Sequence, residues 1–236
     1  MEKLKVLDLF SGIGGFSLGL ERTGGFETVA FCEIEEFPRK VLNKHWPNIP
    51  IYEDVRELTN NNLKEDGIKS DIVVGGFPCQ PFSTAAAGNN PEDYLSQEFG
   101  RIIWETKPKY LIAENTEKKA FSKEFIGRLR ALNYEIYPVH ISADDVGADH
   151  ERGRWWLCAY PHNKSELPAA IDAETSMLQK VQNSVWGAEN YARAIRVPDG
   201  LPDRIHRLKS LGNAVVPQIP ELIGRAILEV ETGKEV

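Results

Sequence analysis

Short apolar runs alternate with amphipathic stretches along most of the chain. The runs have the length of strands, and the amphipathic stretches have the spacing of helices. The pattern predicts strands over 5–10, 27–34, 51–55, 71–77, 109–115, 134–141 and 154–160. It predicts helices over 16–24, 38–46, 96–107 and 122–132, the last with Ser122 as its N-cap. Strands that alternate with helices indicate an α/β fold with a mostly parallel sheet.

The regular pattern fails between residues 161 and 205. This stretch is polar, contains scattered Pro and Gly, and shows no clear period. Such a stretch indicates a small irregular subdomain or an insertion. The helical pattern returns near the end of the chain, where a closing amphipathic helix is marked by Ile219, Leu222, Ile223 and Ala226.

The composition is that of an ordinary globular protein, with 42% hydrophobic and 27% charged residues among 236. No apolar run approaches the roughly 20 residues needed to span a bilayer, and the first residues lack the pattern of a secretion signal. The three cysteines have no CxxC spacing, so neither a disulfide framework nor a metal site is indicated. A reducing cytoplasm is the expected setting. The net charge of −7 argues against a nucleic-acid partner only on average, because local charge can outweigh it.

A glycine-rich turn follows the first predicted strand. The sequence SGIGG at 11–15 lets a ligand approach the backbone, and the next helix begins with free N–H groups. Glu33, at the end of the second strand, can accept hydrogen bonds from a ribose. Asp54 can accept from an adenine amino group, or it can simply cap a turn. The turn lacks GxGxxG, which favours a nucleoside without a pyrophosphate over a dinucleotide. An ordinary tight turn is the alternative.

A rigid turn carries one of the cysteines. Residues 75–83 read GGFPCQPFS, so prolines flank Cys79 directly after the apolar strand 71–77. Ligands of open α/β sheets bind at this carboxyl end of the strands. Cys32 and Cys158 lie within apolar runs and are expected to be small buried side chains. The polar neighbours of Cys79 instead favour a nucleophile.

Two further polar groups stand at the ends of later strands. AENT at 113–116 places Glu114 where a carboxyl group can donate a proton, although a helix cap is the alternative. In HERGR at 150–154, alternation puts Arg152 and Arg154 on one face of an extended segment. Such a pair can hold a phosphate or a carbonyl, and a solvated strand edge is the alternative.

The order of these motifs resembles that of the cytosine-C5-specific DNA methyltransferases, above all their compact solitary or phage-associated members. DLFSGIGG, CEI, GGFPCQPFS, AEN, HxRxR and LGNAVVP follow one another as in that family. The resemblance implies a Rossmann-like class I S-adenosylmethionine-dependent methyltransferase fold, with a mostly parallel seven-stranded sheet and helices on both faces. It implies a catalytic and cofactor-binding domain at 1–160 and 206–236 and a short target-recognition region at 161–205.

The same resemblance implies methyl transfer from S-adenosyl-L-methionine to C5 of cytosine in DNA, with S-adenosyl-L-homocysteine as the product. Cys79 would attack C6 as a thiolate, and Glu114 would hydrogen-bond to N3 or protonate it. Arg152 would hold O2 of the base, and Arg154 would steady the acid or a phosphate. The target base would have to leave the duplex, because a stacked ring is inaccessible to both reactants.

Family analogy also implies the contacts to cofactor and DNA. Cofactor contacts are expected from Phe10, Gly12, Ile13, Gly14, Gly15, Glu33, Ile34, Asp54, Val55, Pro78, Asn213 and Val215. DNA contacts are expected from Gln80, Ser83, Arg193, Arg196, Arg204, Arg207 and Lys209. Double-stranded DNA is therefore the expected partner, in restriction-modification or another DNA methylation system of a bacterial or phage-infected cell.

Some features leave other interpretations open. The chain departs from the family pattern at Asp149 and His150, and its loop after Ser83 lacks the usual Arg. The recognition region is also short, as it is in tRNA cytosine-5 methyltransferases. A catalytic subunit that needs a separate recognition chain is another possibility, and a monomer is expected otherwise. A nicotinamide dehydrogenase is disfavoured, because nothing matches its phosphate loop.

Overall fold

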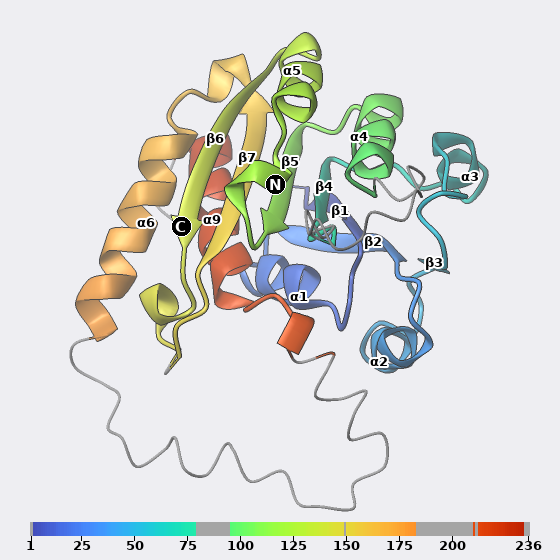
Figure 1. The fold of residues 1–236 in the computed structure, drawn as a ribbon, viewed down its shortest axis with the longest axis horizontal. Coiled ribbons are helices and arrows are strands. Elements are labelled where there is room, and N and C mark those ends of the chain that lie inside the picture. Colours follow the sequence, from blue (N-terminus) through green and yellow to red (C-terminus); the bar gives the residue numbers. More distant parts are fainter. Residues whose placement is uncertain (1, 79–94, 149, 183–209, 211, 234–236) are drawn as a thin grey trace, which may run out of the picture.

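A computed structural model describes residues 2–78, 95–148, 150–182, 210 and 212–233 of the chain. Its centre is a seven-stranded sheet with the strand order β3-β2-β1-β4-β5-β7-β6 (Figure 1). The strands are β1 (Leu4–Leu9), β2 (Phe26–Cys32), β3 (Ile51–Tyr52), β4 (Ile72–Gly75), β5 (Tyr110–Asn115), β6 (Tyr134–Ile141) and β7 (Arg154–Pro161). Neighbouring strands are parallel except at β7, which runs antiparallel to both β5 and β6.

Helices cover both faces of this sheet (Figure 1). On one face, α9 (Gln218–Thr232) packs against both α1 (Gly15–Arg22) and α6 (Leu167–Gln182). The other face carries α3 (Asn60–Glu65), α4 (Leu95–Thr106) and α5 (Lys123–Ala131), whose apolar side chains share one core cluster. Helix α2 (Glu36–His45) follows β2.

The pleat of the strands divides the apolar side chains between two cores. Val6 of β1 packs on the side of α1 and α9, whereas its neighbour Leu7 packs on the side of α4 and α5. Ile112 and Ala113 of β5 divide in the same way. Burial on both faces explains why these strands read as near-continuous apolar runs in the sequence.

Most of the predicted elements are confirmed, with shifts of a few residues at their ends. Strand β6 occupies the predicted residues 134–141. Ser122 is the N-cap of α5, and its Oγ accepts a hydrogen bond from the Phe125 amide at 3.1 Å. Helix α3 was not predicted; its start is fixed by a capping box between Thr59 and Asn62.

The prediction that 161–205 lacks regular structure is wrong for 167–182, which form α6. Leu167, Ala170 and Ile171 are buried in the same core cluster as α9. Glu174 forms an ion pair with Arg225 of α9 at 3.5 Å. The apolar spacing of one helical face was present in the sequence, but Pro168 and the polar flanks concealed it.

The topology confirms the predicted fold class, a Rossmann-like class I methyltransferase fold with a mostly parallel seven-stranded sheet. Its single reversed strand, β7, lies between β5 and β6. None of the helices described is long and apolar enough to cross a membrane.

Candidate active site

The predicted motifs converge at one edge of the sheet. Strands β1, β2, β4 and β5 are parallel, and their carboxyl ends lie at this edge. Because β7 is antiparallel, it begins at the same edge, and Arg154 stands at its first position. Residues far apart in the sequence, from the glycine loop to HERGR, are therefore brought together at the edge where ligands of such sheets bind.

The glycine loop turns sharply between β1 and α1. Phe10 and Gly12 both have left-handed backbone conformations, with φ of 54° and 53°. Ser11 holds the turn, because its Oγ donates to the Asp8 carbonyl at 2.6 Å and accepts from the Cys32 amide at 3.2 Å. A Cβ on Gly12 would meet no atom within 4 Å. The loop therefore presents backbone to open space, while Gly14 and Gly15 behind it are buried.

Glu33 links this loop to the turn after β2. Its residue exposure is 8%, and its carboxylate accepts from the Gly12 amide at 2.7 Å and from the Glu35 amide at 2.8 Å. Burial raises the pKa of Glu33, while the two backbone hydrogen bonds oppose that rise. Each carboxylate oxygen has a second lone pair with which it can accept from a ligand hydroxyl.

The residues beside Glu33 fit a nucleoside. Ile34 leaves 60% of its surface exposed, which suits packing against a flat apolar ring. Ile13 is half-buried on the loop itself. Asp54 follows β3, but both of its carboxylate oxygens accept hydrogen bonds from Arg56, which lowers its pKa. An adenine amino group would have to share this carboxylate with the guanidinium.

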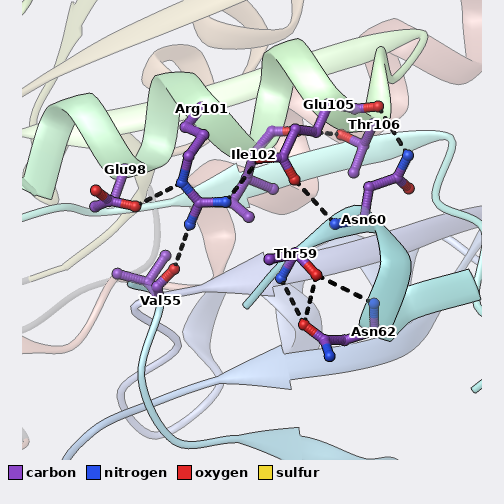
Figure 2. A network of polar contacts seen from close by, with 9 residues as sticks. All are labelled: Val55, Thr59, Asn60, Asn62, Glu98, Arg101, Ile102, Glu105 and Thr106. Carbon is purple, nitrogen blue, oxygen red and sulfur yellow. Dashed lines mark hydrogen bonds and ion pairs between the residues drawn. The ribbon is translucent and has the colours of Figure 1, made fainter. Parts of the chain in front are cut away.

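The segment after Asp54 is tied to α4 by a polar network (Figure 2). Arg101 donates to the Val55 carbonyl at 2.8 Å and bridges Glu98 and Glu105. Glu105 in turn accepts from the Asn60 amide at 2.9 Å. The Val55 side chain is buried in the core, so only its backbone can face a cofactor.

Glu114 and Arg154 form the ion pair at the centre of the site. Arg154 Nε lies 3.0 Å from Glu114 Oε1, and the two side chains are 21% and 15% exposed. A Cβ on Gly76 would lie 2.7 Å from Glu114 Oε2, so only glycine leaves the carboxyl group this position beside the exit of β4. Burial raises the pKa of Glu114, although Arg154 and Arg152 oppose that rise.

Arg152 joins this pair to the C-terminal segment. One of its terminal guanidinium nitrogens donates to the Ala214 carbonyl at 3.1 Å, and its amide donates to Ser142 Oγ at 3.0 Å. A guanidinium has five N–H donors, so Arg152 retains donors that can form a hydrogen bond to a substrate oxygen. Asn213, which precedes Ala214, is exposed, and Val215 is half-buried.

The C-terminal segment in turn closes on α1. A Cβ on Gly15 would lie 2.5 Å from the Val215 carbonyl oxygen, and a Cβ on Gly19 would lie 2.1 Å from that of Pro217. Both contacts are with backbone, which cannot move aside as a flexible side chain could. Small residues on α1 therefore allow residues 215–217, the end of the LGNAVVP motif, to pack against the helix that follows the glycine loop.

Replacement of Gly19 with Ala is expected to destabilise the fold by about 1–3 kcal/mol, because the new methyl group overpacks the contact with Pro217. Thermal and urea unfolding measure the change. Gly127→Ala on α5 is the matched control, since a Cβ there would meet nothing within 4 Å. That control should be neutral or stabilising by up to about 1 kcal/mol. Equal effects of the two substitutions would contradict the close approach.

Asn115 is a site residue to which the sequence motif alone assigned no role. It is 2% exposed, and its Nδ2 donates to the Phe77 carbonyl at 2.9 Å. Phe77 stands two residues before Cys79. The Asn115 side chain therefore joins two segments. It ties the backbone that leads into the cysteine turn to β5, the strand that carries Glu114. Its signal in the sequence was an amide at the end of an apolar strand, which alone does not reveal the hydrogen-bond partner.

Replacement of Asn115 with Asp is expected to slow formation of the covalent DNA adduct predicted from the sequence by about 10- to 100-fold. A carboxylate cannot donate to the Phe77 carbonyl, and small misplacements of reacting groups are costly. Single-turnover kinetics would show a lower rate constant with little change in cofactor affinity. Thr116→Val is the matched control, since Thr116 contacts Asn115 Oδ1 and not the carbonyl. An unchanged rate in Asn115→Asp would contradict this positioning role.

Several predicted site residues lie outside the described residues. They are Cys79, Gln80, Ser83, Arg193, Arg196, Arg204, Arg207 and Lys209. Pro78, the last described residue before the cysteine, is exposed. Cys32 and Cys158 are buried, as expected, and burial raises the pKa of each thiol to about 12.

Comparison with known proteins agrees with these motifs. The family model for C-5 cytosine-specific DNA methylase matches residues 4–194. The Type II methyltransferase M1.ScrFI of Lactococcus lactis is 32% identical over 76% of this chain and 47% of its own length. M.Sau3AI of Staphylococcus aureus is 31% identical over 84% of this chain and 54% of its own. A Spodoptera frugiperda DNMT2 structure has a TM-score of 0.58 at 24% identity, over 68% of this chain and 51% of that one, and supports the fold.

The chain thus spans about half the length of the curated relatives it matches. The family model covers most of the described motifs, from β1 to β7. On these grounds the chain belongs to the C-5 cytosine-specific DNA methylase family.

Proposed function

We propose that this protein transfers a methyl group from S-adenosyl-L-methionine to C5 of a flipped-out cytosine in DNA, through a covalent bond between Cys79 and C6. The observation that carries the proposal is the half-buried Glu114–Arg154 pair beside the exit of β4. This exit leads within four residues to Cys79. The position of Glu114, and of the segment that leads to Cys79, at the same sheet edge as the glycine loop supports an acid and a nucleophile in one site.

The cofactor fits the other half of this edge. Glu33 would accept from the ribose hydroxyls, Ile34 would pack on the adenine, and the backbone at Gly12 would allow close approach. Phe10, Ile13 and Pro78 would contact the cofactor from the same edge, with Asn213 and Val215 on the side of the C-terminal segment. When bound, S-adenosyl-L-methionine supplies an electrophilic methyl group.

The chain's own groups activate the base. The Cys79 thiolate adds to C6, and the Glu114 carboxyl gives a proton to N3, so that negative charge does not accumulate on the ring. Arg152 holds the O2 oxygen, and Arg154 keeps the Glu114 carboxyl in place. C5 then has the electron density to accept a methyl group. N3 then returns its proton to the Glu114 carboxylate. Transfer of the C5 proton to solvent water and departure of Cys79 as a thiolate restore the aromatic ring.

Recognition of the DNA target is proposed for the region 161–205, within which the packing of α6 on α9 favours the part after Gln182. The basic residues of this region would contact phosphates. Flipping the target base out of the duplex would cost a few kcal/mol of stacking free energy. A role in restriction-modification is proposed on the names of the Type II relatives. The cytoplasmic setting and the monomeric state remain predictions.

Transfer of a labelled methyl group to duplex DNA and to tRNA tests the substrate class. We expect 5-methylcytosine in the DNA and none in the tRNA. Label in tRNA alone would contradict DNA as the substrate and favour the tRNA alternative. Cofactor binding without transfer to either nucleic acid would favour a subunit that needs a separate recognition chain.

A further inference from the structure

A row of three residues crosses the sheet beside the catalytic pair. Asn115 of β5 pairs with Trp155 of β7, and Trp155 pairs with His140 of β6. The preceding residues of β5 and β7 are Glu114 and Arg154, the catalytic ion pair. Successive residues of a strand are about 3.3 Å apart along it. The row therefore lies at the same end of the sheet as the proposed site of the flipped base. Alternation directs its side chains to the face that carries α4 and α5, whereas Glu114 and Arg154 point to the other face.

Trp155 joins two polar side chains at this edge. The Lys118 ammonium lies 4.6 Å from the centroid of the Trp155 ring. The His140 ring lies 5.1 Å from it, at an interplanar angle of 63°. A Cβ on residue 153 would come within 2.7 Å of His140 Nε2, so Gly153 leaves room for the imidazole. The indole is half-buried against the core, whereas Lys118 and His140 are exposed.

The ammonium group in this cluster is not neutralised by a carboxylate. Among the described residues, Lys118 takes part in no ion pair, while its neighbour Lys119 pairs with Glu117 at 3.0 Å. Contact with the indole ring holds the Lys118 ammonium by a cation–π interaction, while the side chain stays exposed to solvent. An exposed cation that is held in place at a catalytic edge suits an anionic substrate.

We propose that Lys118, Trp155 and His140 form a contact surface for the phosphate backbone of the DNA strand that carries the target cytosine. The assignment rests on the proposed function. A flipped nucleotide stays covalently joined to its strand, so its neighbouring phosphates must pass close to the Glu114–Arg154 pair. Lys118 supplies charge, His140 supplies a hydrogen-bonding ring nitrogen, and Trp155 holds both. The catalytic domain thereby adds phosphate contacts to those of a short recognition region.

The salt dependence of DNA binding tests this surface. Each phosphate neutralised by a cation contributes about −0.9 to the slope of log K against log salt concentration for duplex DNA. Lys118→Gln is expected to reduce the magnitude of the slope by about 0.9, with weaker binding on every DNA sequence. Loss of a purely structural contact would not alter the slope.

Lys69→Gln is the matched control, because Lys69 is exposed just before β4, at the opposite edge of the sheet. It makes the same change in net charge and should leave the slope unaltered. Equal slopes for wild type and Lys118→Gln would overturn the assignment of this surface without touching the proposed reaction. Equal losses in Lys118→Gln and Lys69→Gln would also overturn it, since they would reflect net charge alone. Failure of the proposed reaction is separate and would appear as absent methyl transfer by the wild type.

Discussion

Replacement of Cys79 with Ser is expected to abolish methyl transfer, with a loss of at least about 10⁴-fold, and to abolish the covalent adduct with DNA. The reason is chemical: a serine hydroxyl ionises far less readily than a thiol and is a poor nucleophile towards C6. The surrounding structure supports this assignment. Asn115 holds the backbone before Cys79, and Glu114, the proposed acid, lies beside the exit of β4.

Duplex DNA containing 5-fluorocytosine measures this effect directly, because fluorine at C5 blocks the elimination that releases the enzyme. With S-adenosyl-L-methionine, the wild type should form a complex that survives denaturant, and Cys79→Ser should form none. Cys158→Ala is the matched control, since burial raises the pKa of the Cys158 thiol to about 12 and keeps it un-ionised. A stable adduct in Cys79→Ser would contradict the assignment of Cys79 as the nucleophile.

Much of the fold could be predicted from local sequence, because buried strands and amphipathic helices leave different periods. Strand β6 and the Ser122 cap are examples in which the residues themselves carry the signal. Helix α6 was missed because only a narrow face of it, around Leu167 and Ile171, is buried. That face becomes recognisable only once α9 is seen packed against it.

In the candidate site, too, some features could be predicted from local sequence and others depend on the fold. Glu114, Arg152 and Arg154 could be chosen from their places at strand ends, but the 3.0 Å ion pair between Glu114 and Arg154 depends on the reversed strand β7. The hydrogen bonds from Asn115 to Phe77 and from Arg152 to Ala214 join residues 38 and 62 positions apart. Contacts of such range follow from topology, which no local period encodes.

Replacement of Glu114 with Gln is expected to lower the rate of methyl transfer by about 10²- to 10⁴-fold while cofactor binding persists. Gln matches the shape of Glu, and its amide oxygen can still accept from Arg154 Nε, so the site should keep its geometry. What it loses is the acidic proton for N3 of the base. Glu124→Gln on the exposed face of α5 is the matched control and should retain full activity.

The pH dependence separates proton donation from mere positioning. Burial raises the pKa of Glu114, so the proton needed for N3 is retained to higher pH than in an exposed glutamate, and it is lost as pH rises through the folded pKa. Cys79, in contrast, must lose its proton to attack as a thiolate, so the rate should fall at acidic pH. The wild type should therefore show a bell-shaped single-turnover profile, and Glu114→Gln should keep only the acidic limb. An alkaline decline that persists in Glu114→Gln would mean that another group donates the proton, and Glu114 would then serve only to hold the base.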